Sequence, residues 1–203
     1  MNFLAHILTG DSGEAMMVGS FAGDFCRGRL EKHPDRLRAG IRLHRMVDAF
    51  AEDHRSFSAV RALLRPSLGL YSAVGADMLI DHLLALEWER WLPGEPLPAF
   101  ADRVGAVLAG NSQWLPENAR RIARMMILGG WLESYAREDG IRTALEKMSM
   151  RTRGNVRLSD AMDELDRSRS EIFAAARDFL GDLFSSTTMI DAGMRGDLST
   201  VMR

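Results

Sequence analysis

Apolar residues recur every three or four positions along most of this chain, which is the spacing of one face of an α-helix. One such stripe lies within 70–92 and contains Ala73, Ala76, Leu79, Ile80, Leu83, Leu84 and Leu86. A second lies within 156–184, with charged residues between Leu158, Ala161, Leu165, Ile172, Ala176, Phe179 and Leu183. Both stretches are predicted to be amphipathic helices.

Clusters of glycine, proline and asparagine interrupt this pattern. The strongest is Pro-Gly-Glu-Pro-Leu-Pro at 93–98, which must break a helix because proline lacks the backbone N–H and clashes with the preceding turn. Other breaks fall at 10–13, 33–34, 66–69, 110–112 and 154–155. About eight helical stretches remain between them. The proline segment is compatible with a boundary between two domains, but a loop within one helical domain is preferred.

The end of the chain has a different composition. Residues 185–203 are rich in Ser, Thr, Gly and Asp, which predicts a flexible tail rather than a packed element. We therefore expect a single helical domain over 1–184, which is within the usual length of one domain.

Composition supports the all-α fold class. The chain has 25 Leu, 24 Ala and 13 Met, but only 8 Val and 8 Ile. Straight-chain residues and alanine lose little freedom in a helix, whereas β-branched residues favour strands. No Asn-Gly or Asp-Gly turn lies between alternating apolar runs, so hairpins are not predicted.

Charge and cysteine content narrow the class of protein. A net charge of −2 disfavours a general nucleic-acid binder, and one cysteine excludes a disulfide framework. No apolar run reaches the roughly 18 residues of a membrane span. Residues 1–6 lack the features of a secretory signal. We expect a cytoplasmic protein whose partner is neither nucleic acid nor membrane.

Residues able to bind a metal are concentrated in the first 82 positions. His44 and Asp48 are four residues apart, so on a helix they share one face. Asp77 and Asp81 have the same spacing, and His82 follows directly. Asp81 and His82 would point about 100° apart on a helix, and we expect both to converge on a metal lying between their directions.

The surroundings of this pair strengthen the metal hypothesis. Leu79, Ile80, Leu83 and Leu84 flank Asp81 and His82, and a buried carboxylate is normally paired or bound to metal. Carboxylates gathered together repel one another unless a cation or protonation compensates. Oxygen and imidazole ligands without thiolate suit Mg, Mn, Fe or Zn, and the oxygens favour Mg or Mn. Such an ion activates water and polarises a phosphoryl oxygen.

Each candidate also has an ordinary structural explanation. A His and an Asp four residues apart often form a hydrogen bond on a helix surface, and Asp81 with His82 is compatible with a structural pair. Asp24 has Arg27 within one turn. His6 follows three apolar residues, where a hydrogen-bonded core histidine is common. Their concentration in one half of the chain favours a shared metal site.

The segment 25–45 is locally basic. It carries two acidic residues and seven basic ones, Arg27, Arg29, Lys32, Arg36, Arg38, Arg42 and Arg45. This charge can receive an acidic partner or a phosphate. A solvated, arginine-rich helix face is an equally good interpretation.

Several of these segments, in this order, resemble the acyl carrier protein phosphodiesterase family. They are Met-Asn-Phe-Leu-Ala-His at 1–6, Gly-Ser-Phe-Ala-Gly-Asp-Phe at 19–25 with Arg27-Gly28, His-Arg-x-Val-Asp-Ala-Phe at 44–50, and Asp-x-x-x-Asp-His-x-Leu at 77–84. Trp-Leu-x-x-Tyr at 131–135 also fits, and the resemblance covers about 1–184. At 51–52 this chain has Ala-Glu where family members often have Thr-Asp.

The resemblance implies an all-helical fold distantly related to the HD-domain phosphohydrolases. It implies hydrolysis of the phosphodiester between 4′-phosphopantetheine and a serine of holo-acyl carrier protein, with Mn²⁺ or Mg²⁺ as cofactor. That activity belongs to the lipid metabolism that uses the carrier. The acidic carrier would be the partner, and the oligomeric state is left open.

Residue roles follow from the same resemblance. The implied metal ligands are Asp24, His44, Asp48, Asp81 and His82. The implied catalytic groups are His6, Asp24 and Asp81. The candidates for binding the substrate are Asn2, Arg27 and Arg45. Two alternative functions stay open, a related phosphohydrolase acting on a nucleotide or another small phosphoester, and a non-catalytic helical protein that binds the carrier.

Overall fold

All regular structure in the described part of the chain is helical, which confirms the predicted all-α class. The structure is a computed structural model that describes residues 3–150, 152 and 156–201, with side chains as far as 187. The α-helices are α1 (Phe3–Thr9), α2 (Glu14–Ala22), α3 (Asp35–Asp53), α4 (Arg55–Leu68), α5 (Ser72–Leu86), α6 (Trp88–Trp91), α7 (Leu97–Gly110), α8 (Glu117–Leu128), α9 (Trp131–Ser134), α10 (Glu138–Ser149) and α11 (Asp160–Val201). Short 3₁₀ helices are η1 (Gly23–Phe25), η2 (Leu30–Lys32), η3 (Gly69–Tyr71) and η4 (Ser112–Trp114).

The helix boundaries follow the breaks in the sequence. Residues 10–13 separate α1 from α2, and the proline segment separates α6 from α7. Proline is tolerated at Pro98 because it stands in the first turn of α7. Gly69 ends α4 with a φ of 55°, a conformation that favours glycine. The break expected at 154–155 lies outside the described residues.

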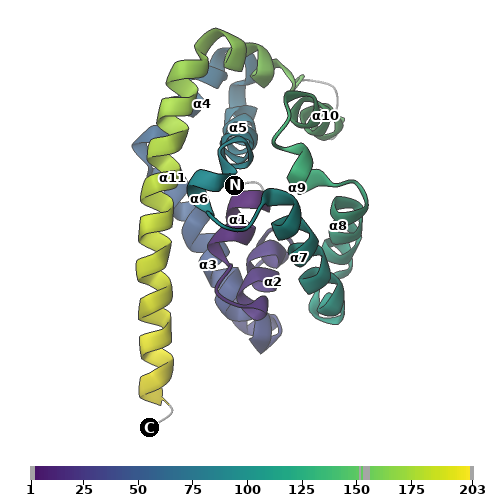
Figure 1. Ribbon diagram of the computed structural model, residues 1–203, viewed down its shortest axis with the longest axis vertical. Helices are drawn as coiled ribbons and strands as arrows, with labels where there is room; N and C mark the ends of the chain where they lie inside the picture. Colours follow the sequence, from purple (N-terminus) through teal and green to yellow (C-terminus); the bar gives the residue numbers. More distant parts are fainter. Residues whose placement is uncertain (1–2, 151, 153–155, 202–203) are drawn as a thin grey trace.

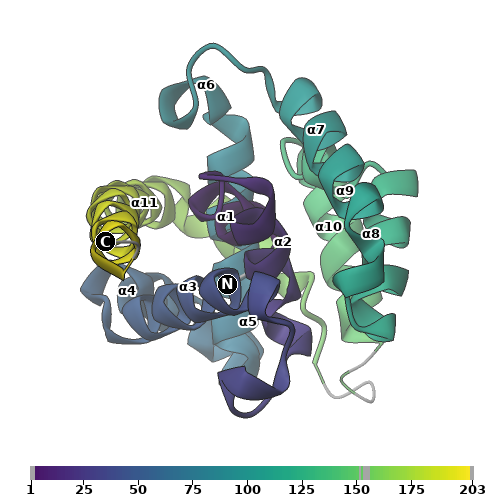
Figure 2. The same ribbon diagram turned by 90° about the horizontal axis from the view of Figure 1, so that it is seen from below.

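The helices form two groups around one apolar core (Figure 2). Helices α1 to α5 and α11 lie on one side, where α11 packs along α4 and α5 (Figure 1). Helices α7 to α10 lie on the other side, and α10 contacts α5. The stretch Arg55–Leu86 is long and apolar enough to cross a membrane, but 67% of the 18 residues that make up its apolar part are buried inside this bundle. It corresponds to the core helices α4 and α5 with the short η3 between them.

Residues 185–201, which lie within the segment predicted to be a tail, continue the last helix. Helix α11 bends at Ser168, where the backbone is non-helical, and then continues to Val201. Two of its hydroxyl side chains donate to carbonyls of the preceding turn, Ser185 to Gly181 at 2.8 Å and Thr187 to Phe184 at 3.2 Å. Such local bonds let Ser and Thr remain within a helix. Figure 1 shows this end of α11 extending past the other helices.

Helices α2 and α3 approach each other closely at Gly19 and Gly40. A β-carbon at Gly19 would lie 2.5 Å from the carbonyl oxygen of Leu37, and one at Gly40 would lie 2.3 Å from that of Met16. Backbone atoms cannot move aside as a flexible side chain can. This contact therefore requires glycine on both helices. It also fixes the position of α3 relative to the end of α2 that follows Gly19.

We expect Gly40→Ala to destabilise the protein by about 1–3 kcal/mol, the usual cost of overpacking. Urea unfolding measures this change. The matched control is Gly181→Ala, because a β-carbon there meets nothing within 4 Å and alanine is favoured over glycine in a helix by roughly 0.5–1 kcal/mol. Equal stability of the two variants would contradict the close contact of α2 and α3.

Candidate metal centre beside a cleft

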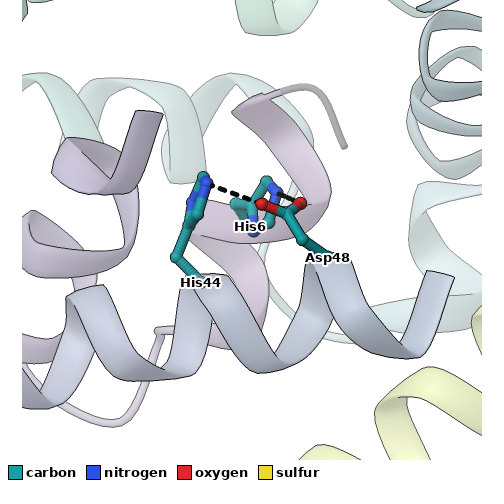
Figure 3. A group of neighbouring side chains, drawn as sticks. All are labelled: His6, His44 and Asp48. Carbon is teal, nitrogen blue, oxygen red and sulfur yellow. Dashed lines mark hydrogen bonds and ion pairs between the residues drawn. The ribbon is translucent and has the colours of Figure 1, made fainter. Parts of the chain in front are cut away.

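The carboxylate of Asp48 lies between two histidines (Figure 3). Its Oδ1 is 3.1 Å from Nε2 of His6 in α1, and its Oδ2 is 3.2 Å from Nε2 of His44 in α3. The two imidazole rings stack with centroids 3.8 Å apart. His44 and Asp48 share one face of α3, as their spacing predicts, and α1 supplies the third side chain.

His44 is held by the backbone of α2 and η1. Its Nδ1 donates a hydrogen bond to the carbonyl oxygen of Ser20 at 2.8 Å, which leaves Nε2 facing the carboxylates. The same Nε2 is 3.4 Å from Oδ1 of Asp24. A β-carbon at Gly23 would lie only 2.1 Å from Cγ of His44. The lack of a side chain at Gly23 therefore leaves the space that the imidazole of His44 occupies.

Asp81 fixes the first turn of α1, the helix that carries His6. The buried Asp81 carboxylate accepts hydrogen bonds from the backbone N–H of Leu4 at 2.9 Å and of Ala5 at 3.0 Å. Ser20 donates to the carbonyl oxygen of His6 at 2.7 Å. The Nδ1 of His6 is buried and has no hydrogen-bond partner among the described residues. A buried polar atom of this kind is rare in folded proteins.

Asp81 and His82 do not converge as we expected. Asp81 faces α1, whereas Nδ1 of His82 donates to the carbonyl oxygen of Tyr135 at 2.7 Å, beyond α9. Neighbouring residues of a helix point in different directions, and here each side chain is held by a different backbone segment. His6, His44, Asp24 and Asp48 come together, while Asp81 and His82 lie in other contacts.

The two histidines of this group differ in their pKa values and therefore in their charge. Burial and the neighbouring His44 lower the pKa of His6 to about 4, partly offset by its bond to Asp48. Burial opposes the charge of His44 too, but its bonds to Asp24 and Asp48 outweigh burial and raise its pKa to about 9. Burial opposes the charge of Asp48 as well, but its hydrogen bonds to His44 and His6 hold its pKa well below its usual range. One charged and one neutral imidazole therefore stack together.

The donor set fits a divalent cation. Within the described residues, His6, His44 and Asp48 offer ligand atoms that all lie within 4.8 Å of one another. The bond from His44 to Ser20 fixes the ring orientation, as second-shell partners of metal-bound histidines do. Two imidazoles and a carboxylate without thiolate suit Mn²⁺, Fe²⁺ or Zn²⁺ at least as well as Mg²⁺.

A cleft of about 810 Å³ opens beside this group. Asp24 belongs to both, because it pairs with His44 and also lines the cleft. Asp77 lines it as well, and sequence analysis assigned this residue no role. Burial raises the pKa of Asp77 to about 6, and the nearby carboxylates of Asp48 and Asp24 add to the rise. In the sequence, the position of Asp77 one helical turn before Asp81 was the signal that pointed to it as a candidate site residue.

The three residues predicted to bind the substrate differ in their exposure and contacts. Arg27 is exposed, and it follows Asp24 by three residues in the sequence. Arg45 donates from Nη2 to the carbonyl oxygens of Cys26 at 2.8 Å and Gly28 at 2.7 Å, so it holds the loop that carries Arg27. Asn2 lies outside the described residues. Of the two residues that replace the Thr-Asp often found in the family, Ala51 is buried and Glu52 is exposed.

Part of the basic segment 25–45 is engaged within the fold. Arg38 donates to the carbonyl oxygens of Leu30 and His33 and pairs with Asp35 at 2.7 Å. Arg29 is 3.5 Å from Glu31. These contacts organise the loop between η1 and α3, so only part of the charge is available for a partner.

Comparison with known proteins identifies the class. Residues 1–183 match the family described as acyl carrier protein phosphodiesterase. The acyl carrier protein phosphodiesterase of Pectobacterium atrosepticum is 29% identical over 168 residues, which cover 82% of this chain and 87% of that protein. The one from Yersinia pestis is 30% identical over 74% of this chain and 79% of its own length. No solved structure matches.

With these relatives, the protein is a helical hydrolase that acts on phosphodiester bonds. More particularly, the chain belongs to the acyl carrier protein phosphodiesterase family, as its motifs had indicated. The relationship to HD-domain proteins stays a prediction.

The raised pKa of His44 predicts how the metal-free protein responds to pH. Its value of about 9 in the fold exceeds the ordinary 6.5, so protonated His44 stabilises the fold fully below pH 6.5 and loses this effect as pH rises to about 9. With a chelator present, we expect the unfolding temperature to fall from pH 7 to pH 9. His44→Asn should flatten that decline, and His33→Asn should not. An unchanged slope in His44→Asn would contradict the assignment.

Proposed function

We propose that this protein hydrolyses the phosphodiester that joins 4′-phosphopantetheine to a serine of holo-acyl carrier protein. The products are apo-carrier and free 4′-phosphopantetheine. The observation that carries the proposal is the contact of Asp24 with both the His6–His44–Asp48 group and the cleft. A cleft with room for substrate beside a candidate metal centre supports this reaction. Action on this carrier, in fatty acid metabolism, implies a cytoplasmic location.

We assign His6, His44 and Asp48 as the residues that hold a divalent cation, Mn²⁺ or Mg²⁺. Asp24, whose oxygen is 3.4 Å from His44, completes the ligand set. When bound, the ion supplies activation of water and polarisation of the phosphoryl oxygens. Asp81 and His82 act as positioning residues, because Asp81 holds the first turn of α1 and His82 holds the backbone at Tyr135.

The chain's own groups have distinct parts in the reaction. Asp24 is half-exposed, and its bond to His44 keeps its pKa low despite burial, so it is ionised and able to accept a hydrogen bond from the attacking water. Asp77 lines the same cleft, where burial raises its pKa, and in its protonated form it would donate a hydrogen bond to the phosphate. Arg27 offers its guanidinium to the phosphate, and Arg45 holds its loop in place.

Intact-mass spectrometry of holo-carrier tests this function. We expect the wild-type protein with Mn²⁺ to remove the mass of 4′-phosphopantetheine. Asp48→Asn should lower the rate on the order of 100-fold or more, because it removes the carboxylate that faces both histidines. Asp53→Asn is the matched control, since Asp53 is an exposed carboxylate at the end of the same helix.

Full activity of Asp48→Asn would overturn the assignment of the centre. No mass loss with Mn²⁺, Mg²⁺, Fe²⁺ or Zn²⁺ would overturn the proposed reaction.

Gly23 provides a test of the metal centre that does not depend on turnover. A β-carbon there would displace the ring of His44, so we expect Gly23→Ala to weaken Mn²⁺ binding at least tenfold, as loss of supporting contacts around a metal commonly does (about 10–100-fold). Calorimetric titration with Mn²⁺ measures the affinity. Gly110→Ala is the control, because a β-carbon at Gly110 meets nothing within 4 Å. Equal Mn²⁺ affinity in both variants would exclude His44 as a ligand.

A further inference from the structure

We propose that the cleft beside the candidate centre receives the pantetheine arm of the substrate. This inference rests on the proposed function, because it takes the reacting phosphate to lie at the His6–His44–Asp48 group. It adds where the rest of the prosthetic group lies and which helices recognise it.

The cleft lies between the two groups of helices. Phe25 from η1 and Val74 and Met78 from α5 line one wall. Residues of α8, α9 and α10 line the other, on the side of the molecule that Figure 2 shows opposite α1 to α5. Its volume of about 810 Å³ falls in the range of roughly 300–1,000 Å³ found for small-molecule sites. The second group of helices thus has a direct use in binding.

The chemistry of the walls matches the arm. Pantetheine has apolar methyl and methylene groups, two amides and a hydroxyl, and it carries no charge. The cleft combines apolar surfaces from Met78, Ile122 and Trp131 with the neutral polar groups of Asn118 and Ser134. Apolar walls with a few placed hydrogen-bonding groups are typical of specific ligand pockets. The lining also includes the exposed charged side chains of Arg121, Asp139 and Lys147.

The shape of the substrate determines the direction in which the arm lies in the cleft. The reacting phosphate joins a serine on a folded protein to a slender, flexible arm. A cleft of this size admits the arm but not the carrier domain. With the phosphate near Asp24, the arm therefore extends along the cleft toward α9 and α10, and the carrier stays outside, next to the exposed loop that carries Arg27.

Filling the cleft tests this placement. Ala144 is a partly buried lining residue on α10, and Ala144→Phe adds a ring that occupies the space assigned to the arm. We expect calorimetric titration to show binding of free pantetheine to the wild-type protein and at least tenfold weaker binding to this variant. The kcat/KM for holo-carrier should fall at least tenfold, mainly through KM.

The matched control is Ala62→Phe, the same change at an exposed position of α4, and it should bind pantetheine and act on holo-carrier within twofold of the wild type. Circular dichroism and unfolding temperature establish that both variants fold. Competitive inhibition of the wild-type enzyme by pantetheine gives a test that needs no variant.

The outcomes separate the two proposals. If the wild type releases the arm from holo-carrier and Ala144→Phe binds pantetheine and turns over as well as the control, the cleft assignment is wrong and the function stands. If AMP binds in the cleft and pantetheine does not, a nucleotide is the ligand and the cleft assignment is wrong. If the wild type releases no 4′-phosphopantetheine with any divalent metal, the proposed function itself fails.

Discussion

The close contact of α2 and α3 at Gly19 and Gly40 is the constraint on which the candidate centre depends. Because no side chain separates the two helices there, the carbonyl oxygen of Ser20 reaches Nδ1 of His44 at 2.8 Å. The chain then turns through Gly23, where the absent β-carbon leaves space for the ring of His44. Asp24 follows at once and meets the same ring. The contact of α2 with α3 thus brings His44 next to Ser20, Gly23 and Asp24.

A second constraint comes from a buried charge. Asp81 is fully buried in α5, and burial raises its pKa to about 7, although the backbone donors of Leu4 and Ala5 oppose that rise. A buried carboxylate is costly without hydrogen bonds, so its two bonds tie α1 firmly to α5. His6 is the next residue along α1. The carboxylate that the sequence offered as a metal ligand thus contacts the turn that precedes His6.

The fold and half of the site could be predicted from local patterns. Apolar periodicity and proline positions gave the helical class and most boundaries, and the spacing of His44 and Asp48 gave their shared face. Local patterns do not report which distant backbone a side chain meets. Asp81 and His82 therefore appeared as ligands, because their bonds to Leu4 and Tyr135 join segments far apart in the sequence. Asp77 received no role for the same reason, since only the packing of α8 to α10 against α5 creates the cleft.

The most direct measurement is the position of a bound ion. Crystals grown with Mn²⁺ would give an anomalous signal that locates the metal without reference to activity. The structure predicts a peak among Nε2 of His6, Nε2 of His44 and the carboxylate of Asp48, with Asp24 close by. A peak at Asp81 and His82, with none beside Asp48, would contradict the account.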